Sequence, residues 1–350
     1  MNDNTFLIKS KKVGENQATF IVAEVAQAHD GSLGAAHAYI DAIASTGADA
    51  VKFQTHIADA ESSMLEPFRV RFSLQDETRY EYWKRMEFTF DQWKGLASHA
   101  ADKGLIFLSS PFSVQAIELL VKIGMSAWKI ASGEVSNPLL LDRMLKTGSP
   151  ILLSTGMSPL SEVDQVVAKI KKHGNPLLVM QCTSKYPVKP EDVGLNMLNV
   201  YRDRYQILVG LSDHSGKIYP GLAAATLGAS MVEVHVTMSY EQFGPDVPAS
   251  LTTSDLKTMV DGIHFINHAL NHPVKKDEMA VSLAEMKKIF GQSLTARVQL
   301  TAGQVISVSD LSSRKPGTII PVSQVDAIVG KKVLRDIPAG DFILPEDIQN

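Results

Sequence analysis

Two histidines follow apolar runs of the sequence and have the chemistry to bind a divalent metal ion. His214 lies in VGLSDHSG (209–216), directly after an apolar run, and His235 lies in the next run, MVEVHVT (231–237). If these runs are neighbouring parallel strands, the two imidazoles can meet across one strand spacing. Two neutral histidines with waters or substrate oxygens form an open site for Mn²⁺ or Mg²⁺, with Co²⁺ as a further candidate. A pair of hydrogen-bonded histidines without metal is the alternative interpretation.

Lysines and serines at the ends of other apolar runs indicate an anion site. Lys52 and Lys129 each follow such a run. The accompanying hydroxyls belong to Ser110, Ser132, Ser154 and Ser184. Ammonium groups surrounded by hydroxyls suit a dianionic phosphate or a carboxylate. Alternatively, the lysines pair with Glu24 or Glu134, and these two carboxylates are also candidate proton carriers because their pKa values respond to nearby charge.

The elements that must position these side chains read as an α/β fold. Apolar runs alternate with segments of helical period, and the runs are 20–27, 48–55, 105–112, 126–134, 150–157, 176–184, 206–215 and 231–237. Near-continuous apolar strands indicate a parallel sheet that is buried on both faces. Their number over roughly 250 residues matches a closed (β/α)₈ TIM barrel, whose active site lies at the carboxyl ends of its strands. A doubly wound open sheet is the alternative.

The helical segments carry start signals. In the segment 91–104, Asp91 is the predicted N-cap. In the segment 161–174, Ser161 and Asp164 are predicted to form an approximate capping box. We also expect the long connection 57–90, which is rich in charged and aromatic residues, to be a lid or a partner surface.

The barrel pattern stops near residue 270, so we divide the chain into three parts. Residues 1–272 form the barrel, residues 273–287 a linker, and residues 288–350 a small β-rich domain. The last part contains a repeat, because LTAGQVISVSDL (300–311) and IPAGDFILPEDI (337–348) share an Ala-Gly pair and a final Asp-Leu or Asp-Ile. The repeat predicts two similar halves that form one small core.

The composition limits the possible classes of protein. The chain of 350 residues has a net charge of −4 and 21% charged residues, which gives no reason to expect nucleic acid or an acidic membrane surface as a partner. One cysteine excludes an internal disulfide, and no apolar run reaches the length of a membrane span. With a polar N-terminus that lacks a signal core, these features predict a cytoplasmic protein.

The motifs as a set resemble a known family. The stretches IVAEVAQAHDGSL, DAVKFQ, FLSSPF, WKIASGE, PILLSTGM, CTSKYP, VGLSDHSG and EVHVT occur in this order. They resemble the sialic acid synthase (N-acetylneuraminate synthase) family, and DLSSRKPGT (310–318) resembles its antifreeze-like (SAF) domain. The resemblance implies a metal-dependent enzyme that condenses phosphoenolpyruvate with an N-acetylated hexosamine to a nine-carbon 2-keto sugar acid and phosphate. The acceptor would be N-acetylmannosamine or a 2,4-diacetamido-trideoxyhexose.

The resemblance also implies roles for individual residues. The metal ligands are His214 and His235, and catalytic roles fall on Glu24, Glu134 and Lys129. The phosphoenolpyruvate site comprises Lys52, Ser110, Lys129, Ser132, Ser154, Ser184 and Ser212. The sugar site comprises Gln54, Glu134, Tyr186 and Asp246, with Arg314 or Lys315 reaching it from the SAF domain of a partner in a domain-swapped homodimer.

Three positions depart from the family pattern. Ala28 and Val247 stand where an asparagine and a histidine are usual, at positions where we expect sugar contacts. Lys315 stands where the swapped arginine is usual, and Arg314 precedes it. These changes affect the expected sugar more than the expected phosphoenolpyruvate chemistry.

Two rival functions fit parts of the pattern. A Schiff-base pyruvate aldolase on the same fold would use Lys129 as its nucleophile and would need no metal. A carbohydrate- or ice-binding module would use the SAF domain without turnover, although the charges in 310–349 disfavour a flat ice-binding face.

Overall fold

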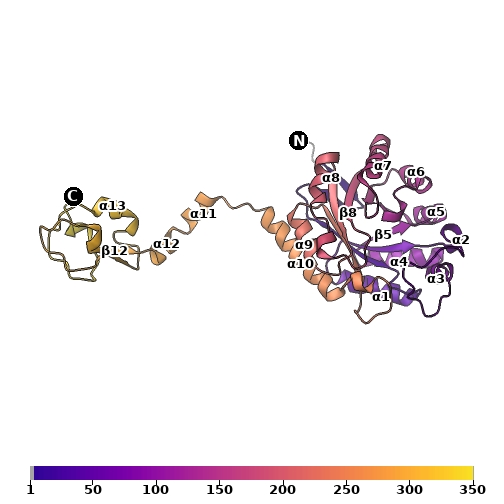
Figure 1. The fold of residues 1–350 in the computed structure, drawn as a ribbon, viewed down its shortest axis with the longest axis horizontal. Coiled ribbons are helices and arrows are strands. Elements are labelled where there is room, and N and C mark those ends of the chain that lie inside the picture. Colours follow the sequence, from indigo (N-terminus) through magenta and orange to yellow (C-terminus); the bar gives the residue numbers. More distant parts are fainter. Residues whose placement is uncertain (1–3, 350) are drawn as a thin grey trace. The chain divides into compact units, whose positions relative to one another are not determined.

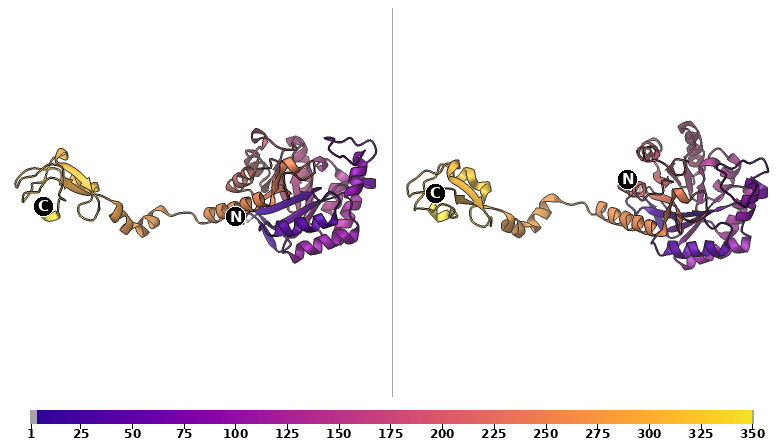
Figure 2. Two further views of the ribbon diagram at one scale, coloured as in Figure 1. Left: turned by 90° about the horizontal axis from the view of Figure 1, so that it is seen from below. Right: turned by 60° about the horizontal axis from the view of Figure 1, so that its bottom comes forward.

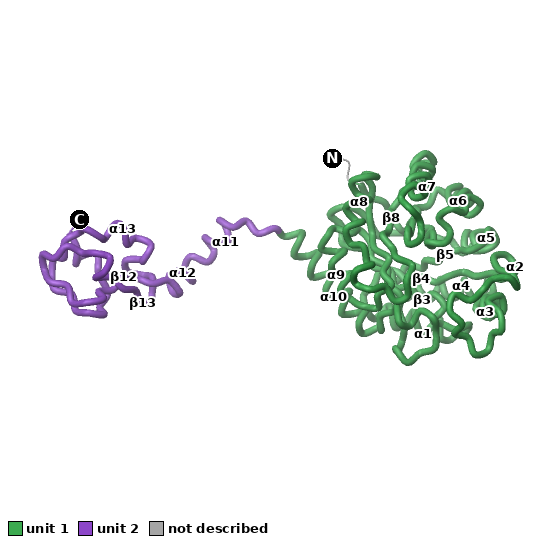
Figure 3. Tube along the Cα trace, viewed as in Figure 1, with its two compact units in different colours: residues 1–272 green, residues 273–350 purple. Residues whose placement is uncertain are grey.

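The computed structural model describes residues 4–349. They divide into two compact units, with the boundary between His272 and Pro273 (Figure 3). Within the described residues, no helix is long and apolar enough to cross a membrane.

The first unit contains a ring of parallel strands. They are β3 (Phe20–Ala26), β4 (Ala50–Thr55), β5 (Ile106–Pro111), β6 (Trp128–Ile130), β7 (Ile151–Ser154), β8 (Leu177–Cys182), β9 (Leu208–Asp213) and β10 (Met231–Thr237). Hydrogen bonds join them in the order β5-β4-β3-β10-β9-β8-β7-β6, and β5 lies beside β6. The short strand β11 (Ser250–Thr252) extends the ladder from β10. This order confirms the predicted (β/α)₈ barrel and excludes the doubly wound sheet.

Helices surround the strands (Figure 1). They are α1 (Leu33–Ala44), α2 (Ala58–Glu61), α3 (Arg79–Met86), α4 (Phe90–Asp102), α5 (Val114–Ile123), α6 (Pro138–Leu145), α7 (Leu160–His173), α8 (Met197–Tyr205), α9 (Tyr219–Thr226) and α10 (Thr253–Leu270). The large side chains between strands and helices include Tyr39, Phe53, Trp93 and Trp128, each at most 1% exposed. Their burial removes apolar area from water and holds the helices on the sheet.

Two of the predicted helix starts are wrong. The N-cap of α4 is Thr89, which forms a capping box with Gln92, so Asp91 lies in the first turn. No capping box joins Ser161 and Asp164 in α7, whose N-cap is Pro159. Several polar residues lie near the start of both α4 and α7, so the sequence alone does not single out the N-cap. Each helix begins where the preceding chain leaves the barrel.

The inside of the barrel changes from apolar to polar along each strand. Successive strand residues point to opposite faces, so in β4 Ala50 belongs to the interior core, Phe53 packs toward the helices, and Lys52 and Gln54 line a cavity. A hairpin that the sequence patterns did not reveal, β1 (Thr5–Ile8) with β2 (Lys11–Gly14), contributes Ile8 and Val13 to the interior core. It packs against the residues at the amino ends of the strands, so the cavity is accessible at their carboxyl ends.

The predicted long connection 57–90 contains α2 and α3 (Figure 2). It has its own small aromatic cluster, in which Tyr82, Trp83 and Met86 are buried and Phe68 and Phe72 pack on them. Its residues also line the cavity, as expected for a covering segment.

The second unit is small and built around the repeat. Its elements are α11 (Lys276–Ser282), α12 (Ala284–Phe290), β12 (Ser293–Ala296), β13 (Leu311–Arg314) and α13 (Val325–Ile328). The equivalent residues Leu300 and Ile337 exchange backbone hydrogen bonds of 2.9 Å. Asp310 and Asp347 each accept a hydrogen bond from the backbone N–H three residues earlier. The two halves therefore repeat locally and share one core.

Candidate active site

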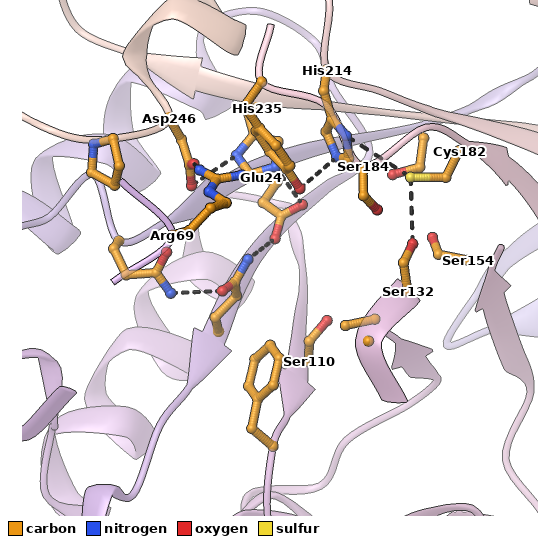
Figure 4. A pocket seen from close by; sticks show the side chains of 18 of the residues that line it. Glu24, Arg69, Ser110, Ser132, Ser154, Cys182, Ser184, His214, His235 and Asp246 are labelled. Atoms are coloured by element: carbon orange, nitrogen blue, oxygen red, sulfur yellow. Dashed lines mark hydrogen bonds and ion pairs between the residues drawn. The ribbon is translucent and has the colours of Figure 1, made fainter. Parts of the chain in front are cut away.

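One cavity of about 290 Å³ receives side chains from every strand of the ring. It collects most residues to which the sequence assigns a role (Figure 4). They are Glu24, Lys52, Gln54, Ser110, Lys129, Ser132, Ser154, Ser184, Tyr186, Ser212, His214, His235 and Asp246. Residues far apart in the sequence thus form one site, because parallel strands of a barrel end at the same face.

Two lysines and two glutamates form a buried cluster at the base of the cavity. Lys52 Nζ lies 2.5 Å from Glu24 Oε1 and 3.5 Å from Glu233 Oε1. Lys129 Nζ donates to Glu233 Oε1 at 2.7 Å, and Ser212 Oγ donates to the same oxygen at 3.2 Å. All four ionisable side chains are at most 4% exposed. Such charges persist in a buried site because they are paired.

The pKa shifts in this cluster favour the charged forms. Burial opposes the charge of Glu24, but Lys52 and His235 outweigh burial and hold its pKa well below the usual range. Burial also opposes the charge of Lys129, but Glu233 and Glu24 raise its pKa above the usual value. Glu24 is therefore a carboxylate and Lys129 an ammonium group at neutral pH.

Two buried polar atoms of the cavity lack a partner. Ser154 Oγ and Glu233 Oε2 make no hydrogen bond among the described residues. Buried polar atoms in native proteins normally have a partner. A polar ligand or ordered water in the cavity would satisfy both atoms.

Gly156 provides the close approach that the hydroxyl groups need. Its N–H donates to Ser132 Oγ at 2.9 Å. A Cβ at this position would lie 2.4 Å from Ser184 Oγ, 2.7 Å from Ser132 Oγ and 2.9 Å from Cys182 Sγ. Only glycine therefore allows these three side chains to converge.

We expect Gly156→Ala to weaken binding of the anion, which the family resemblance predicts to be phosphoenolpyruvate. The added methyl group must displace Ser132 and Ser184, so the KM for phosphoenolpyruvate should rise about 10-fold. Gly95→Ala is the matched control, because no heavy atom outside its own helix lies within 4 Å of the added Cβ. Steady-state kinetics of both variants measures the difference. An equal KM for phosphoenolpyruvate in Gly156→Ala and Gly95→Ala would show that the hydroxyl groups around Gly156 do not belong to the anion site.

The two histidines lie side by side at one end of the cavity. Their ring centroids are 5.2 Å apart, and both residues are at most 4% exposed. His214 Nδ1 lies 3.0 Å from the Thr183 carbonyl, which only accepts hydrogen bonds, so this nitrogen carries a proton. Its Nε2 faces the Tyr186 hydroxyl at 3.2 Å. His235 Nε2 lies 3.4 Å from Glu24 Oε2.

This pair fits an open metal site with few protein ligands. No group of three histidine, cysteine, aspartate or glutamate side chains among residues 4–349 has the arrangement of a closed metal site. The Thr183 carbonyl fixes the orientation of His214, as outer hydrogen bonds do for metal-binding histidines. Burial lowers the pKa of His214, but the Cys182 sulfur and Thr183 raise it to about 9. Metal binding would displace the second proton, since a ligand imidazole is neutral.

The covering segment contributes a side chain to which the sequence assigns no role. Arg69 Nη2 donates to Asp246 Oδ1 at 3.2 Å, and its guanidinium carbon lies 4.2 Å from the centre of the Tyr186 ring. Both partners are predicted sugar residues, so Arg69 connects the two sides of the expected sugar site. No spacing or motif could have revealed it, because it lies in an irregular loop.

For the two substrates that the family resemblance predicts, we expect Arg69→Ala to raise the KM for the sugar about 10-fold and to leave the KM for phosphoenolpyruvate unchanged. Arg69→Lys should recover only part of the loss, because lysine lacks the planar donor fork. Arg71→Ala is the control, as Arg71 is exposed on the same loop and does not line the cavity. An equal rise in both KM values would contradict a role restricted to the acceptor.

Other residues with expected roles lie elsewhere. Glu134 does not line the cavity, and its carboxylate accepts a hydrogen bond from Asn137 at 2.8 Å. Arg314 and Lys315 belong to the second unit, so their contact with the sugar stays a prediction. Ala28 packs on the barrel core and Val247 is 8% exposed, and neither lines the cavity. The expected effect of these last two on sugar contacts stays a prediction.

Comparisons with known proteins agree with this architecture. The model of the NeuB family matches residues 39–275, and the SAF domain model matches residues 291–349. The N,N'-diacetyllegionaminic acid synthase of Legionella pneumophila is 32% identical and covers 100% of both chains. The N-acetylneuraminate-9-phosphate synthase of Mus musculus is 30% identical over 98% of this chain and 96% of that protein.

A solved structure gives the same result. The N-acetylneuraminic acid synthetase of Leptospira borgpetersenii, crystallised with citrate, superposes with a TM-score of 0.72 at 28% identity. The match covers 81% of this chain and 97% of that chain. Since the family model alone spans more than half of the sequence, the chain belongs to the NeuB family and is an enzyme of the sialic acid synthase type that carries a SAF domain.

Proposed function

We propose that this enzyme condenses phosphoenolpyruvate with an N-acetylated hexosamine and releases phosphate. The observation that carries the proposal is the combination, in one cavity, of a lysine pair surrounded by hydroxyls with a buried histidine pair. The first group suits a dianionic phosphate with a carboxylate, and the second suits a divalent ion. The acceptor is N-acetylmannosamine or a 2,4-diacetamido-trideoxyhexose in its open-chain aldehyde form.

In this proposal the base of the cavity binds phosphoenolpyruvate. Lys52 and Lys129 hold the phosphate and carboxylate, while Ser110, Ser132, Ser154, Ser184 and Ser212 donate hydrogen bonds. Binding must compete with Glu24 and Glu233 for the two ammonium groups, which favours a ligand of high charge. The unpartnered Ser154 Oγ is then satisfied by the ligand.

His214 and His235 would hold a divalent ion, with Mn²⁺ or Mg²⁺ as the expected ion and Co²⁺ as a further one. Such an ion supplies Lewis-acid polarisation of the acceptor aldehyde when bound. Gln54, Tyr186 and Asp246 bind and orient the acceptor beside it, and Arg69 fixes Asp246. Tyr186 stacks on His214 with 4.2 Å between ring centroids, so the acceptor site and the histidine pair are coupled.

The reaction forms a carbon–carbon bond and a carbon–oxygen bond to water, and it breaks the carbon–oxygen bond to the phosphate. Carbon 3 of phosphoenolpyruvate attacks the aldehyde carbon, water adds to carbon 2, and phosphate leaves with the bridging oxygen. We assign the proton of this water to Glu24, because its carboxylate is ionised and lines the cavity. Glu134 does not line the cavity, which supports the choice between the two.

The Schiff-base aldolase is disfavoured by the state of Lys129. A lysine nucleophile needs a lowered pKa so that its amine is free. Glu233 and Glu24 instead raise the pKa of Lys129. Borohydride with pyruvate should therefore trap no adduct, and a chelator should stop turnover.

We also propose a homodimer in the cytoplasm. None of the residues of α11 and α12 is buried within the single chain, although Val281, Ile289 and Phe290 are apolar and more than 60% exposed. A second copy would cover this surface and bring Arg314 or Lys315 to the partner's acceptor site.

The test is phosphate release from phosphoenolpyruvate with Mn²⁺, against a panel of N-acetylmannosamine and 2,4-diacetamido-trideoxyhexoses. We expect release that requires one of the sugars and stops with a chelator. Release without any sugar, or no release with every sugar, would overturn the proposal.

A further inference from the structure

A chain of hydrogen bonds leads from a buried glutamate outside the cavity to Glu24. Glu61, the last residue of α2, pairs with His56 Nδ1. His56 Nε2 lies 2.7 Å from Gln27 Nε2 and 3.3 Å from Gln54 Oε1. Gln27 Nε2 also lies 2.6 Å from Gln54 Oε1. Gln54 Nε2 then donates to Glu24 Oε1 at 2.7 Å.

The charge of Glu24 fixes the direction of every bond in this chain. A carboxylate only accepts hydrogen bonds, so Gln54 must present its amide nitrogen to Glu24 and its oxygen to Gln27. Gln27 then donates one N–H to Gln54 and the other to His56. The shorter of the two contacts of His56 Nε2 is with this Gln27 nitrogen, so Nε2 accepts a hydrogen bond and Nδ1 carries the proton that Glu61 accepts.

The surroundings of His56 keep it in place. The residue is 4% exposed, and its ring is stacked between Trp83 at 3.9 Å and Phe112 at 4.5 Å between centroids. Trp83 belongs to α3 of the covering segment, and its indole N–H donates to Glu66 at 3.1 Å. His56 thus joins the covering segment to the polar groups of the cavity.

We propose that His56 and Glu61 are positioning residues for the reaction. They act through Gln27 and hold the Gln54 amide in the orientation that serves both Glu24 and the acceptor. Neither His56 nor Glu61 lines the cavity, so neither touches a substrate. The inference rests on the proposed function, in which Glu24 and Gln54 act on water and sugar.

Three variants of His56 separate the hydrogen bonds from the packing. His56→Phe keeps an aromatic ring between Trp83 and Phe112 but removes both hydrogen bonds. His56→Gln can place an acceptor toward Gln27, whereas His56→Asn can only keep the donor toward Glu61. We expect kcat to fall about 10-fold in His56→Phe and His56→Asn and to recover in part in His56→Gln. The KM for phosphoenolpyruvate should stay within twofold.

Glu61 offers a matched pair of variants. Glu61→Gln keeps an acceptor for His56 Nδ1–H and should retain nearly all activity. Glu61→Leu removes the acceptor and should resemble His56→Phe. If Glu61 only stabilised the fold, its variants would have lower unfolding temperatures, but kcat would not be retained in Glu61→Gln and lost in Glu61→Leu. Thermal unfolding is therefore measured for each variant.

The decisive experiment is a double-mutant cycle with Gln54→Ala, measured as phosphate release with Mn²⁺ and the panel sugars. If His56 acts through Gln54, His56→Phe should change kcat less than twofold in the Gln54→Ala background. The same 10-fold loss of kcat in both backgrounds, or no loss of kcat in His56→Phe alone, would show that His56 does not act through Gln54.

Nitrogen chemical shifts of His56 test the direction of the hydrogen-bond chain independently of turnover. With ¹⁵N-histidine and His56→Phe for assignment, we expect the neutral form protonated at Nδ1. A proton on Nε2 would overturn the inference even in an active enzyme. If the wild type releases no phosphate with any sugar, the proposed function fails, and the tautomer alone decides whether the hydrogen-bond chain has this direction.

Discussion

Replacing His214 or His235 with alanine should lower kcat on the order of 1000-fold while the barrel stays folded. Both imidazoles lie at the carboxyl ends of strands, above the apolar interior core, and neither belongs to that core. Each loss removes one of the two imidazole ligands proposed for the divalent ion. Turnover kinetics with excess Mn²⁺ and calorimetric titration with Mn²⁺ measure the two consequences separately.

The control for this prediction is His99→Ala. His99 lies on α4 and contacts His37 and Asp41 outside the cavity, so its removal should leave kcat and Mn²⁺ binding unchanged. Full turnover of His214→Ala and His235→Ala in the presence of a chelator would show that the histidines are a hydrogen-bonded pair without a metal. Circular dichroism verifies that the variants remain folded.

Replacing Lys129 with methionine should have the second large effect. The variant loses one ammonium group of the anion site, so kcat/KM for phosphoenolpyruvate should fall about 100-fold or more. It also leaves the buried Glu233 with only Lys52 at 3.5 Å and Ser212 as partners. Breaking a buried ion pair in this way costs about 3 kcal/mol of unfolding free energy.

A double variant separates the two consequences. Lys129→Met with Glu233→Gln removes the unpaired charge and should recover most of the stability, since neutral replacement of a buried pair costs little. It should not recover kcat/KM for phosphoenolpyruvate. Urea unfolding and steady-state kinetics measure the two quantities. An unchanged KM and kcat in Lys129→Met would remove Lys129 from the anion site.

Much of the barrel and its site follows from simple periodicity. The inward residues of a strand recur every second position, so a polar residue near the end of an apolar run points into the barrel. This rule places Lys52 and His235 in the cavity, and it would also have placed Glu233, two residues before His235. The fold was predictable because eight such runs alternate with helices.

The remaining features depend on contacts that periodicity does not encode. Strand β6 ends at Ile130 and a 3₁₀ turn follows, so the alternation is lost before Glu134 and its side chain leaves the cavity. Arg69 reaches Asp246 from an irregular loop whose path is set by the aromatic cluster of the covering segment. The hairpin 5–14 is too short and too rich in lysine to resemble a strand pair in the sequence.

In the proposed reaction, carbon 3 of phosphoenolpyruvate joins the sugar and phosphate leaves by cleavage of its carbon–oxygen bond. The most direct measurement uses phosphoenolpyruvate with ¹⁸O in the bridging position, Mn²⁺ and the sugar that supports turnover. We expect labelled phosphate, released in equal amount to a nine-carbon 2-keto sugar acid without label. Unlabelled phosphate, or labelled phosphate released without the sugar, would contradict this reaction.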